Sequence, residues 1–285
     1  MKVLLTGSSG FIGSYFIEHS PEQYDIKTFS FQKDDLDTID LSNIDAIIHL
    51  SALVHQMGGA EKEAYEKINV SQTIDLAKKA NESGVKHFIF MSTVKVYGEE
   101  TNAAYTENTL CKPDDDYGKS KLKAENALLQ MEDDTFRVSI IRTPIVYGYG
   151  VKANIKNLVN MVSKIFILPF GGIENRRSMV YIGNLSYLIN EIMQQQKSGI
   201  FLASDDEPLS TTRLIEYIAN ALRKKVYLVK IPFFETFLKL AKPSFHQRLF
   251  GSLEVDNSQT KKVLGLKNPY STEEGIKYMI QGEKK

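Results

Sequence analysis

The chain has 285 residues, of which 42% are hydrophobic, so it is long enough to form one large globular domain or a domain with an added lobe. Lys and Arg total 35, as do Asp and Glu, so no overall charge attracts nucleic acid or an anionic membrane, and any anionic ligand must be bound by a local cluster. The single cysteine, Cys111, excludes a disulfide framework and a cysteine metal site, and the histidines lack metal-binding spacing, so we expect no metal ion.

The first residues predict a strand, a glycine-rich turn and a helix. Residues 2–6 (KVLLT) are an apolar run, 7–13 (GSSGFIG) contain the glycines, and a helical pattern continues to about His19. Glycines in such a turn let the backbone approach a pyrophosphate, whose charge is attracted by the helix N-terminus. A plain turn with close helix packing is the alternative. The residues that we expect to bind a dinucleotide here are Gly7, Gly10, Phe11, Ile12 and Gly13.

The second predicted strand, residues 25–31, bears on the choice between NAD(H) and NADP(H). Its end carries Ser30 and Lys33 where an NAD-preferring fold usually has a carboxylate for the ribose hydroxyls. A lysine tolerates the 2′-phosphate, so this pattern favours NADP(H), unless Asp34 or Asp35 binds the ribose and Lys33 is simply solvated.

The third predicted strand, residues 45–50, is buried and leads to small residues that let a dinucleotide lie across the strand ends. His49 falls inside this apolar strand, so we expect a core histidine rather than a catalytic one. The expected cofactor contacts around this strand are Asp40, Leu41, Leu50, Ser51 and Ala52.

Strands and helices continue to alternate along the next part of the chain. The pattern predicts a helix at 61–83, a strand at 87–91, a helix from Tyr117 to about Gln130 and a strand at 136–143. This spacing indicates an α/β fold with a doubly wound parallel sheet and right-handed crossovers.

Tyr117 and Lys121 are one turn apart on the predicted helix and therefore share a face. A phenol has a pKa of about 10, and a nearby ammonium favours the phenolate, so we expect Lys121 to lower the pKa of Tyr117 and make it a general acid or base. Residues 92–98, which include hydroxyls, follow the fourth strand at the sheet edge where such folds bind ligands. The acidic residues 114–116 are expected to stabilise the helix N-terminus rather than to bind metal.

The pattern loosens after Gly150, where a substrate lobe is expected to begin. We predict an amphipathic helix at 154–164, helices near 184–196, 211–223 and 233–248, a strand at 199–203 and a terminal helix from about residue 272. Arg176 and Arg177 suit a diphosphate because guanidinium groups bind phosphate oxygens bidentately, although Arg176 could be solvated. No apolar run has spanning length and no signal segment precedes the first strand, so we expect a cytoplasmic protein without a membrane span.

Six motifs occur in order over nearly the whole chain, and together they resemble the extended short-chain dehydrogenase/reductase family, also called the NAD-dependent epimerase/dehydratase family. The motifs are TGSSGFIG at 6–13, DAIIHLSA at 45–52, NV at 69–70, STVKVYG at 92–98, YGKSK at 117–121 and RTPIVYG at 142–148. The resemblance implies a Rossmann-like domain of residues 1–150 plus about 178–203, and a smaller C-terminal lobe of 151–177 and 204–285 that binds a nucleotide-sugar. It also implies NAD(H) or NADP(H) as the cofactor and a homodimer formed through the helices near 61–83 and 117–130.

The resemblance assigns roles to single residues. Thr93 matches the catalytic Ser/Thr, Tyr117 the acid/base, and Lys121 the lysine that holds the nicotinamide ribose. Asn69 and Pro144 match further cofactor contacts. The matches on the substrate side are Thr93, Lys95, Asn154, Arg177 and Arg248.

Within the family, the closest resemblance is to bacterial UDP-4-keto-6-deoxy-N-acetylhexosamine 4-reductases, which supply surface polysaccharides. It rests on STVKVYGE at 92–99, LPFGGIENRRS at 168–178 and RLFGSLEVD at 248–256. Val94 and Lys95 replace the Asp-Glu pair that a 4,6-dehydratase needs, so that reaction is discounted. Tyr97 is typical of 4-epimerases, so a UDP-hexose 4-epimerase remains an alternative. A non-catalytic dinucleotide-binding scaffold or sensor is a further alternative, although such proteins typically lose the tyrosine or the lysine.

Overall fold

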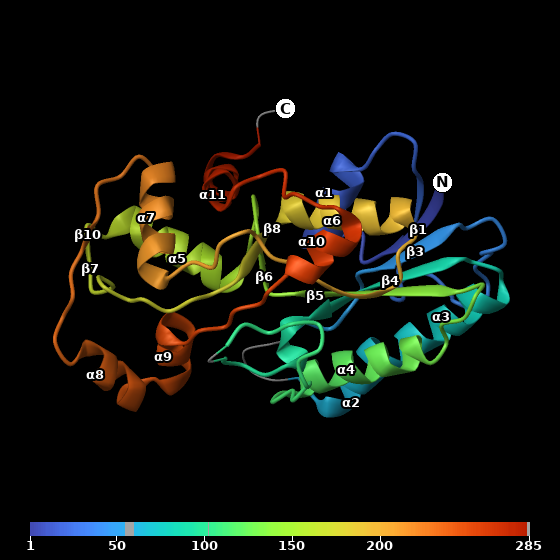
Figure 1. Cartoon of the computed structure of the whole chain (residues 1–285), viewed down its shortest axis with the longest axis horizontal. Coiled ribbons are helices and arrows are strands. Elements are labelled where there is room, and N and C mark those ends of the chain that lie inside the picture. The colour runs from blue at the N-terminus through green and yellow to red at the C-terminus, as the bar shows by residue number, and fades with distance from the viewer. Residues whose placement is uncertain (55–59, 102, 284–285) are drawn as a thin grey trace.

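A six-stranded parallel sheet forms the centre of the molecule, as the computed structural model of the chain shows for residues 1–54, 60–101 and 103–283 (Figure 1). The strand order is β2-β1-β3-β4-β5-β9, and every neighbouring pair is parallel. The predicted doubly wound α/β fold is therefore confirmed. The strands are β1 (Lys2–Thr6), β2 (Asp25–Phe29), β3 (Ala46–His49), β4 (His87–Thr93), β5 (Arg137–Thr143) and β9 (Gly199–Leu202).

The strand order reverses at β1, which pairs with β2 on one side and with β3 on the other. Thr6, the last residue of β1, is in register with Phe29 of β2 and His49 of β3. In open α/β sheets the ligand lies outside the carboxyl ends of the strands at such a reversal. The fold therefore directs attention to the loops that follow β1, β3 and β4.

Helices cover both faces of the sheet. Val3 and Leu5 face one helical layer while Leu4 faces the other, because successive residues of a strand point to opposite faces. The first layer contains α1 (Phe11–His19), α6 (Ile182–Gln195) and α10 (Ser258–Leu264). The second layer contains α2 (Lys62–Tyr65), the π-helical turn η1 (Glu66–Ser71), α3 (Gln72–Glu82) and α4 (Asp116–Leu129). Burial on both faces explains why the strands read as continuous apolar runs.

A smaller lobe extends to one side of the sheet and has an apolar core of its own, drawn mostly from residues 147–182 and 209–279 (Figure 1). Two pairs of short strands, β6 with β8 and β7 with β10, belong to this region. The elements are β6 (Ile145–Tyr147), α5 (Ala153–Lys164), β7 (Ile167–Leu168), β8 (Met179–Tyr181), α7 (Thr211–Ala221), β10 (Tyr227–Leu228), α8 (Phe234–Ala241), α9 (Pro243–Phe250) and α11 (Thr272–Gln281). The domain boundaries given above stay a prediction.

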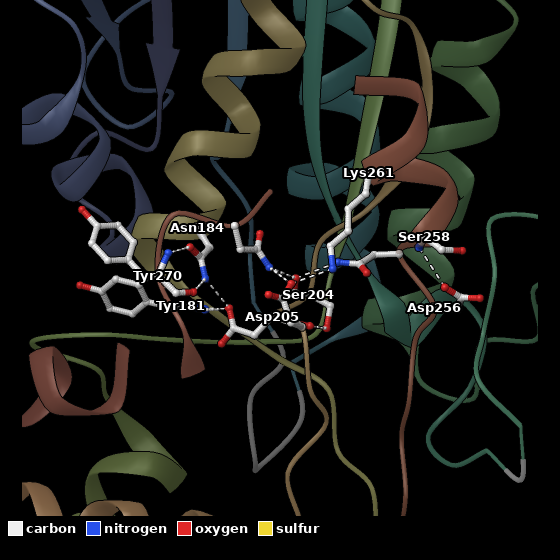
Figure 2. Close-up of polar contacts among 11 residues, drawn as sticks. Tyr181, Asn184, Ser204, Asp205, Asp256, Ser258, Lys261 and Tyr270 are labelled. Atoms are coloured by element: carbon white, nitrogen blue, oxygen red, sulfur yellow. Dashed lines mark hydrogen bonds and ion pairs between the residues drawn. The ribbon is translucent and has the colours of Figure 1, made fainter. Parts of the chain in front are cut away.

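A buried carboxylate, Asp205, joins the end of the sheet to the lobe. It follows β9, and Figure 2 shows it beside Tyr181 and Asn184. Asn184 Nδ2 donates to Asp205 Oδ1 over 2.8 Å, and the backbone N–H of Tyr181 donates to the same oxygen over 3.0 Å. The hydroxyl of Tyr147 donates to Asp205 Oδ2 over 2.6 Å. One side chain thus fixes β6, β8 and α6 relative to the last strand of the sheet.

Two differences between the predicted and the observed elements bear on the lobe and on the candidate site. The helix predicted at 233–248 is broken into α8 and α9, because Pro243 lacks a backbone N–H and excludes the helical conformation at Lys242, whose φ is −145°. The fourth strand continues to Thr93 rather than ending at Met91. Its extension is important because it carries the candidate catalytic hydroxyl to the very end of β4, where the short 3-10 helix η2 (Val94–Val96) begins.

Candidate active site

The turn between β1 and α1 requires glycine. Gly7 has a φ of +71°, and a Cβ there would lie 2.8 Å from the backbone nitrogen of Ser51. A Cβ at Gly13 would lie 2.3 Å from the carbonyl oxygen of Gly7. Gly10 caps α1 without a side-chain hydrogen bond, so the N–H groups of the first turn of α1, around Phe11 and Ile12, are available to an anionic group. This cradle fits the diphosphate of a dinucleotide.

A chain of hydrogen bonds next to the cradle fixes the tautomer of His49. Thr73 donates to the carbonyl of Asn69 over 2.8 Å, so its hydroxyl oxygen accepts from His49 Nε2 over 3.0 Å. His49 Nδ1 then accepts from the hydroxyl of Thr6 over 2.8 Å, and Thr6 Oγ1 accepts from the N–H of Ser51. Burial, with the charge of Lys121 adding to it, lowers the pKa of His49 to about 3. The prediction that His49 is a core histidine is confirmed, and its role is to hold the loop after β3.

Asn69, expected as a cofactor contact, uses its side chain within the protein. Its Oδ1 accepts from the N–H of Leu53 over 2.8 Å, and its Nδ2 donates to the carbonyl of Leu53 and to the hydroxyl of Ser120, both over 3.0 Å. Ser120 in turn donates to the carbonyl of Tyr117. Asn69 lies in the π-helical turn η1, and such turns are frequent at functional sites. It links the loop after β3 to the first turn of α4.

The end of β2 carries both groups considered for the adenosine ribose. The backbone N–H of Ser30 donates to Asp34 Oδ2 over 2.8 Å, so a carboxylate stands directly beside the strand end. Lys33 is exposed next to it. The structure therefore places the acid and the lysine together, and the choice between NAD(H) and NADP(H) stays a prediction.

Two further expected cofactor residues, Asp40 and Leu41, lie in the segment before β3. The side chain of Leu41 is 1% exposed and packs in the core beside α3 and α4, so only its backbone could contact the cofactor, and the expected contact stays a prediction. Asp40 is exposed and its Oδ1 accepts from the N–H of Ser42 over 2.9 Å, which stabilises the turn before β3. Leu50, Ser51 and Ala52 are partly buried directly after β3, and Pro144 is buried between β5 and β6.

The candidate catalytic residues lie at the carboxyl end of β4. Thr93 is its last residue and is 7% exposed. The ammonium of Lys121 lies 3.9 Å from the ring centroid of Phe90, which precedes Thr93 on the same strand. Tyr117 is one turn earlier than Lys121 on α4, and a Cβ at Gly118 would lie 2.8 Å from the carbonyl of Lys95. The start of α4 therefore packs directly on the turn that follows Thr93.

The electrostatics of Tyr117 and Lys121 are governed by desolvation. Burial lowers the pKa of Lys121 to about 7, although the carboxylate of Glu125 opposes the shift. Burial also raises the pKa of Tyr117, and Asp115 and Tyr65 raise it further. Our expectation of a lowered pKa for Tyr117 was therefore wrong for the protein alone, because burial disfavours the phenolate and the charge of Asp115 disfavours it further. Tyr117 is held as a neutral phenol with a proton to donate.

Lys95 is clamped by two carboxylates that the sequence did not assign to the site. Its ammonium pairs with Glu99 and lies 2.7 Å from Asp115 Oδ2. Burial would lower the pKa of Lys95, but the hydrogen bonds and charges of these two carboxylates raise it overall. Asp115 also accepts from the N–H of Gly118 over 2.7 Å and so caps α4, which confirms its expected structural role.

A buried ion pair behind the site was also missed by the sequence analysis. Arg142 of β5 donates to Glu125 of α4, with Nη2 2.6 Å from Oε2, and its Nη1 donates to the hydroxyl of Tyr97 over 2.6 Å. Ser92, which precedes Thr93, donates to the same carboxylate. Glu125 is one turn after Lys121, and this spacing was the available signal in the sequence. The network ties α4, β4 and β5 together at the level of the candidate catalytic residues.

In the lobe, the two adjacent arginines point to different surroundings. Arg177 Nη1 donates to the carbonyl of Gly251 over 2.9 Å, and its pKa is lowered by burial although the carboxylates of Glu99 and Glu100 oppose the shift. Arg177 therefore lies near the residues that follow η2. Arg176 is exposed and forms a bidentate pair with Glu254, with N–O distances of 2.6 and 2.7 Å. Only Arg177 is placed on the side of the candidate site.

The remaining substrate candidates lie at helix ends in the lobe. Arg248 is exposed in the last turn of α9, and Asn154 is exposed in the first turn of α5. Both residues stay predicted substrate contacts.

Comparison with known proteins gives the family. Residues 3–202 match the model of the NAD dependent epimerase/dehydratase family. The chain is 37% identical over 310 residues to a protein of Vibrio cholerae called UDP-glucose 4-epimerase, covering 98% of this chain and 94% of that one. It is 28% identical over 252 residues to the N-acetyl-alpha-D-glucosaminyl-diphospho-ditrans,octacis-undecaprenol 4-epimerase of Escherichia coli O157:H7, covering 81% and 76%.

Solved structures share the fold. The UDP-glucuronic acid 4-epimerase of Bacillus cereus in complex with NAD superposes with a TM-score of 0.78 at 20% identity, covering 99% of this chain and 98% of that one. The dTDP-4-dehydrorhamnose reductase of Bacillus anthracis in complex with NADP superposes with a TM-score of 0.77 at 23% identity, covering 98% of each. The glycine cradle and the β4–α4 junction are consistent with the matched family model. The chain therefore belongs to the NAD dependent epimerase/dehydratase family and is an NAD(P)-dependent enzyme of the extended short-chain dehydrogenase/reductase type.

Proposed function

We propose that this enzyme transfers a hydride between the nicotinamide of NAD(P) and C4 of a hexose carried on UDP. The observation that carries the proposal is the junction of β4 and α4, where Thr93, Tyr117 and the buried ammonium of Lys121 lie at the ligand-binding edge of the sheet. The Vibrio cholerae relative, matched over nearly its whole length, is called UDP-glucose 4-epimerase and supports a substrate of this class.

Each residue then has a defined task. Tyr117, held as a neutral phenol by burial, donates its proton to the sugar oxygen at C4, and Thr93 shares a hydrogen bond with that oxygen. Lys121 holds the nicotinamide ribose from its buried position. Arg177 binds the diphosphate of the substrate, and we propose Arg248 and Asn154 as further substrate contacts. The nicotinamide supplies or accepts the hydride.

The region around Lys95 argues against elimination of water from the sugar. A 4,6-dehydratase needs an additional acid and base after the catalytic threonine, whereas this chain has Val94 and a lysine held by Glu99 and Asp115. We propose that Lys95 contributes to substrate binding through this fixed ammonium and takes no part in proton transfer.

The net reaction that we propose is reduction of the C4 ketone of a UDP-4-keto-6-deoxy-N-acetylhexosamine, giving UDP-N-acetylquinovosamine or UDP-N-acetylfucosamine for surface polysaccharide. The two lobe segments that resemble the 4-reductases, 168–178 and 248–256, run side by side: Ser178 N donates to the carbonyl of Leu253 over 2.9 Å, and Leu253 N to the carbonyl of Arg176 over 2.9 Å. They thus form one unit around Arg177, which supports a shared substrate.

A 4-epimerase is the second candidate. The 37% identity to the Vibrio cholerae protein over 98% of this chain favours it. The same residues would serve both steps of hydride transfer. The retained NAD⁺ would first take the hydride from C4, and the keto sugar would then turn and receive it back on its other face. In either case we propose a cytoplasmic homodimer formed through the helices η1–α3 and α4.

One assay separates the candidates. The purified enzyme is incubated with UDP-4-keto-6-deoxy-N-acetylglucosamine and NADPH or NADH, and the product is identified by NMR. We expect one equivalent of reduced cofactor to be consumed with formation of a C4 hydroxyl. Enzyme that is purified with NAD⁺ and interconverts UDP-hexose 4-epimers without consuming NADPH is the 4-epimerase instead. Turnover of neither substrate class, by enzyme that still binds NAD(P), would contradict hydride transfer at C4.

A further inference from the structure

The far end of the lobe exposes a concentration of large apolar side chains, which we call the outer apolar face. Of the 17 exposed large hydrophobic residues in the described part of the chain, ten lie within 165–167 and 227–245. Figure 1 shows β7, β10, α8 and α9, on or next to which these residues lie, at the end of the molecule opposite β1 and β3. The face consists of Ile165, Phe166, Ile167, Tyr227, Val229, Ile231, Phe233, Phe237, Leu240 and Phe245.

Helix α8 is apolar on two sides. Leu238 is 7% exposed and packs into the lobe core, as expected for a surface helix. Phe237 and Leu240, three residues apart on one face of α8, are 64% and 80% exposed, and Phe233, directly before the helix, is 85% exposed. Phe233 also has a φ of +60°, an unfavourable conformation for a residue with a large side chain. A concentration of exposed apolar side chains at one end of a molecule indicates an interaction surface.

The backbone that carries the exposed side chains is anchored to the lobe. The rings of Phe234 and Phe170 lie 6.1 Å apart and attach the start of α8 to the lobe core. The N–H of Tyr227 donates to the carbonyl of Phe166 over 2.7 Å, and β7 pairs with β10 in parallel register. The start of α8 and the β7–β10 ribbon are therefore attached to the lobe.

The charge around the outer apolar face is strongly positive. Residues 223–248 contain seven Lys and Arg but a single acidic residue, Glu235, although the whole chain has equal numbers of basic and acidic residues. Lys225, Lys230, Lys239 and Lys242 are exposed among the apolar side chains. Aromatic and aliphatic groups flanked by lysines are the composition of helices that lie in the interface of an anionic bilayer, with the ammonium groups at the headgroups.

We propose that the outer apolar face docks the enzyme on the surface of an anionic phospholipid bilayer. In the described ranges no helix is long and apolar enough to cross a membrane, so the enzyme lies on the bilayer rather than in it. Phe233, Phe237 and Leu240 enter the boundary between headgroups and acyl chains. Helices α3 and α4, the expected dimer helices, lie on another side of the molecule, so dimerisation leaves this face free (Figure 1). The proposal does not depend on the identity of the sugar substrate.

Vesicle co-sedimentation tests this docking. The full chain is mixed with vesicles of phosphatidylcholine alone or with about 30 mol% phosphatidylglycerol, at low and at high salt. We expect binding to the anionic vesicles, weakened by salt, and at least about tenfold weaker binding for the double variant Phe237→Ser/Leu240→Ser and for Lys230→Glu/Lys242→Glu. The matched control is Leu110→Ser, which removes a 75% exposed leucine far along the chain from the outer apolar face and should bind as the parent does.

Sedimentation velocity and thermal melting accompany the binding data. All the substituted side chains are exposed, so we expect unchanged melting temperatures and hence no effect through unfolding. Absence of binding to anionic vesicles by the parent protein would overturn the proposal. So would equal binding by the parent and the Phe237→Ser/Leu240→Ser variant. If that variant instead loses a dimer that the parent forms without lipid, the face is an interface between two copies and membrane docking is refuted.

Discussion

Replacing Tyr117 by phenylalanine should lower kcat by about 10²- to 10⁴-fold, the usual contribution of a positioned general acid. The substitution removes the phenolic proton but keeps the ring that packs 6.2 Å from the ring of Tyr65. Lys121 and the glycine cradle are untouched, so NAD(P) binding should stay within about a factor of three, since no contact of the cradle is lost. Steady-state kinetics and a fluorescence titration of NADPH measure the two effects separately.

Tyr65→Phe is the matched control, since it removes a phenol hydroxyl from the neighbouring ring and leaves Tyr117 in place. We expect it to retain most of the activity. Equal losses in the two variants would show that the region tolerates no change of polarity and that the assignment of Tyr117 is unsupported. A loss confined to KM, with kcat unchanged, would give Tyr117 a role in substrate binding instead of proton transfer.

Replacing Arg142 by leucine should destabilise the fold by about 3–5 kcal/mol, because it leaves the carboxylate of Glu125 buried without its cation. Glu125 is fully buried, and Arg142 Nη2 lies 2.6 Å from its Oε2. Burial alone would lower the pKa of Arg142, but the hydrogen bonds and charge of Glu125 raise it, so the guanidinium stays charged. Urea denaturation should show the loss directly, and the melting temperature should fall by roughly 10 °C.

Two further variants serve as controls for that loss of stability. Arg213→Leu removes one partner of an exposed pair, with 3.1 Å between Arg213 Nη1 and Glu216 Oε2, and should cost less than about 1 kcal/mol. The double variant Arg142→Leu/Glu125→Leu removes both buried charges and should recover much of the stability lost by the single change. If Arg142→Leu were no more destabilising than Arg213→Leu, the buried pair would not be the support of the β4–α4 junction that we describe.

The sequence was sufficient to predict features that depend on local patterns. The glycines of residues 7–13 lie between an apolar strand and a helix, and the structure shows that a Cβ at Gly13 would collide with the carbonyl of Gly7. The apolar runs of β1, β3 and β4 follow from burial on both faces of a parallel sheet. The break between α8 and α9 also had a local signal, Pro243, which our prediction of one helix at 233–248 overlooked.

Other features depend on contacts between distant segments, for which one sequence gives no local signal. Arg142 is 17 positions from Glu125 and on a different element, so only the assembled sheet shows them to be partners. Arg177 donates a hydrogen bond to the carbonyl of Gly251, which is 74 positions away in the sequence. The raised pKa of Tyr117 is a property of the packed site, since the spacing to Lys121 shows the cation but not the loss of water. The outer apolar face could not be predicted for the same reason. Its apolar residues could equally belong to a core, and only the folded structure shows that they are exposed.

A crystal structure of the enzyme with NAD⁺ and a UDP-hexose tests the central claim most directly, since the reaction at C4 depends on the groups around one sugar oxygen. We predict the hydroxyl of Tyr117 at about 2.6–3.2 Å from the 4-oxygen of the hexose, with Thr93 on the same oxygen and C4 facing the nicotinamide. A hexose bound with its 4-oxygen directed away from Tyr117, or with a different carbon against the nicotinamide, would contradict the account.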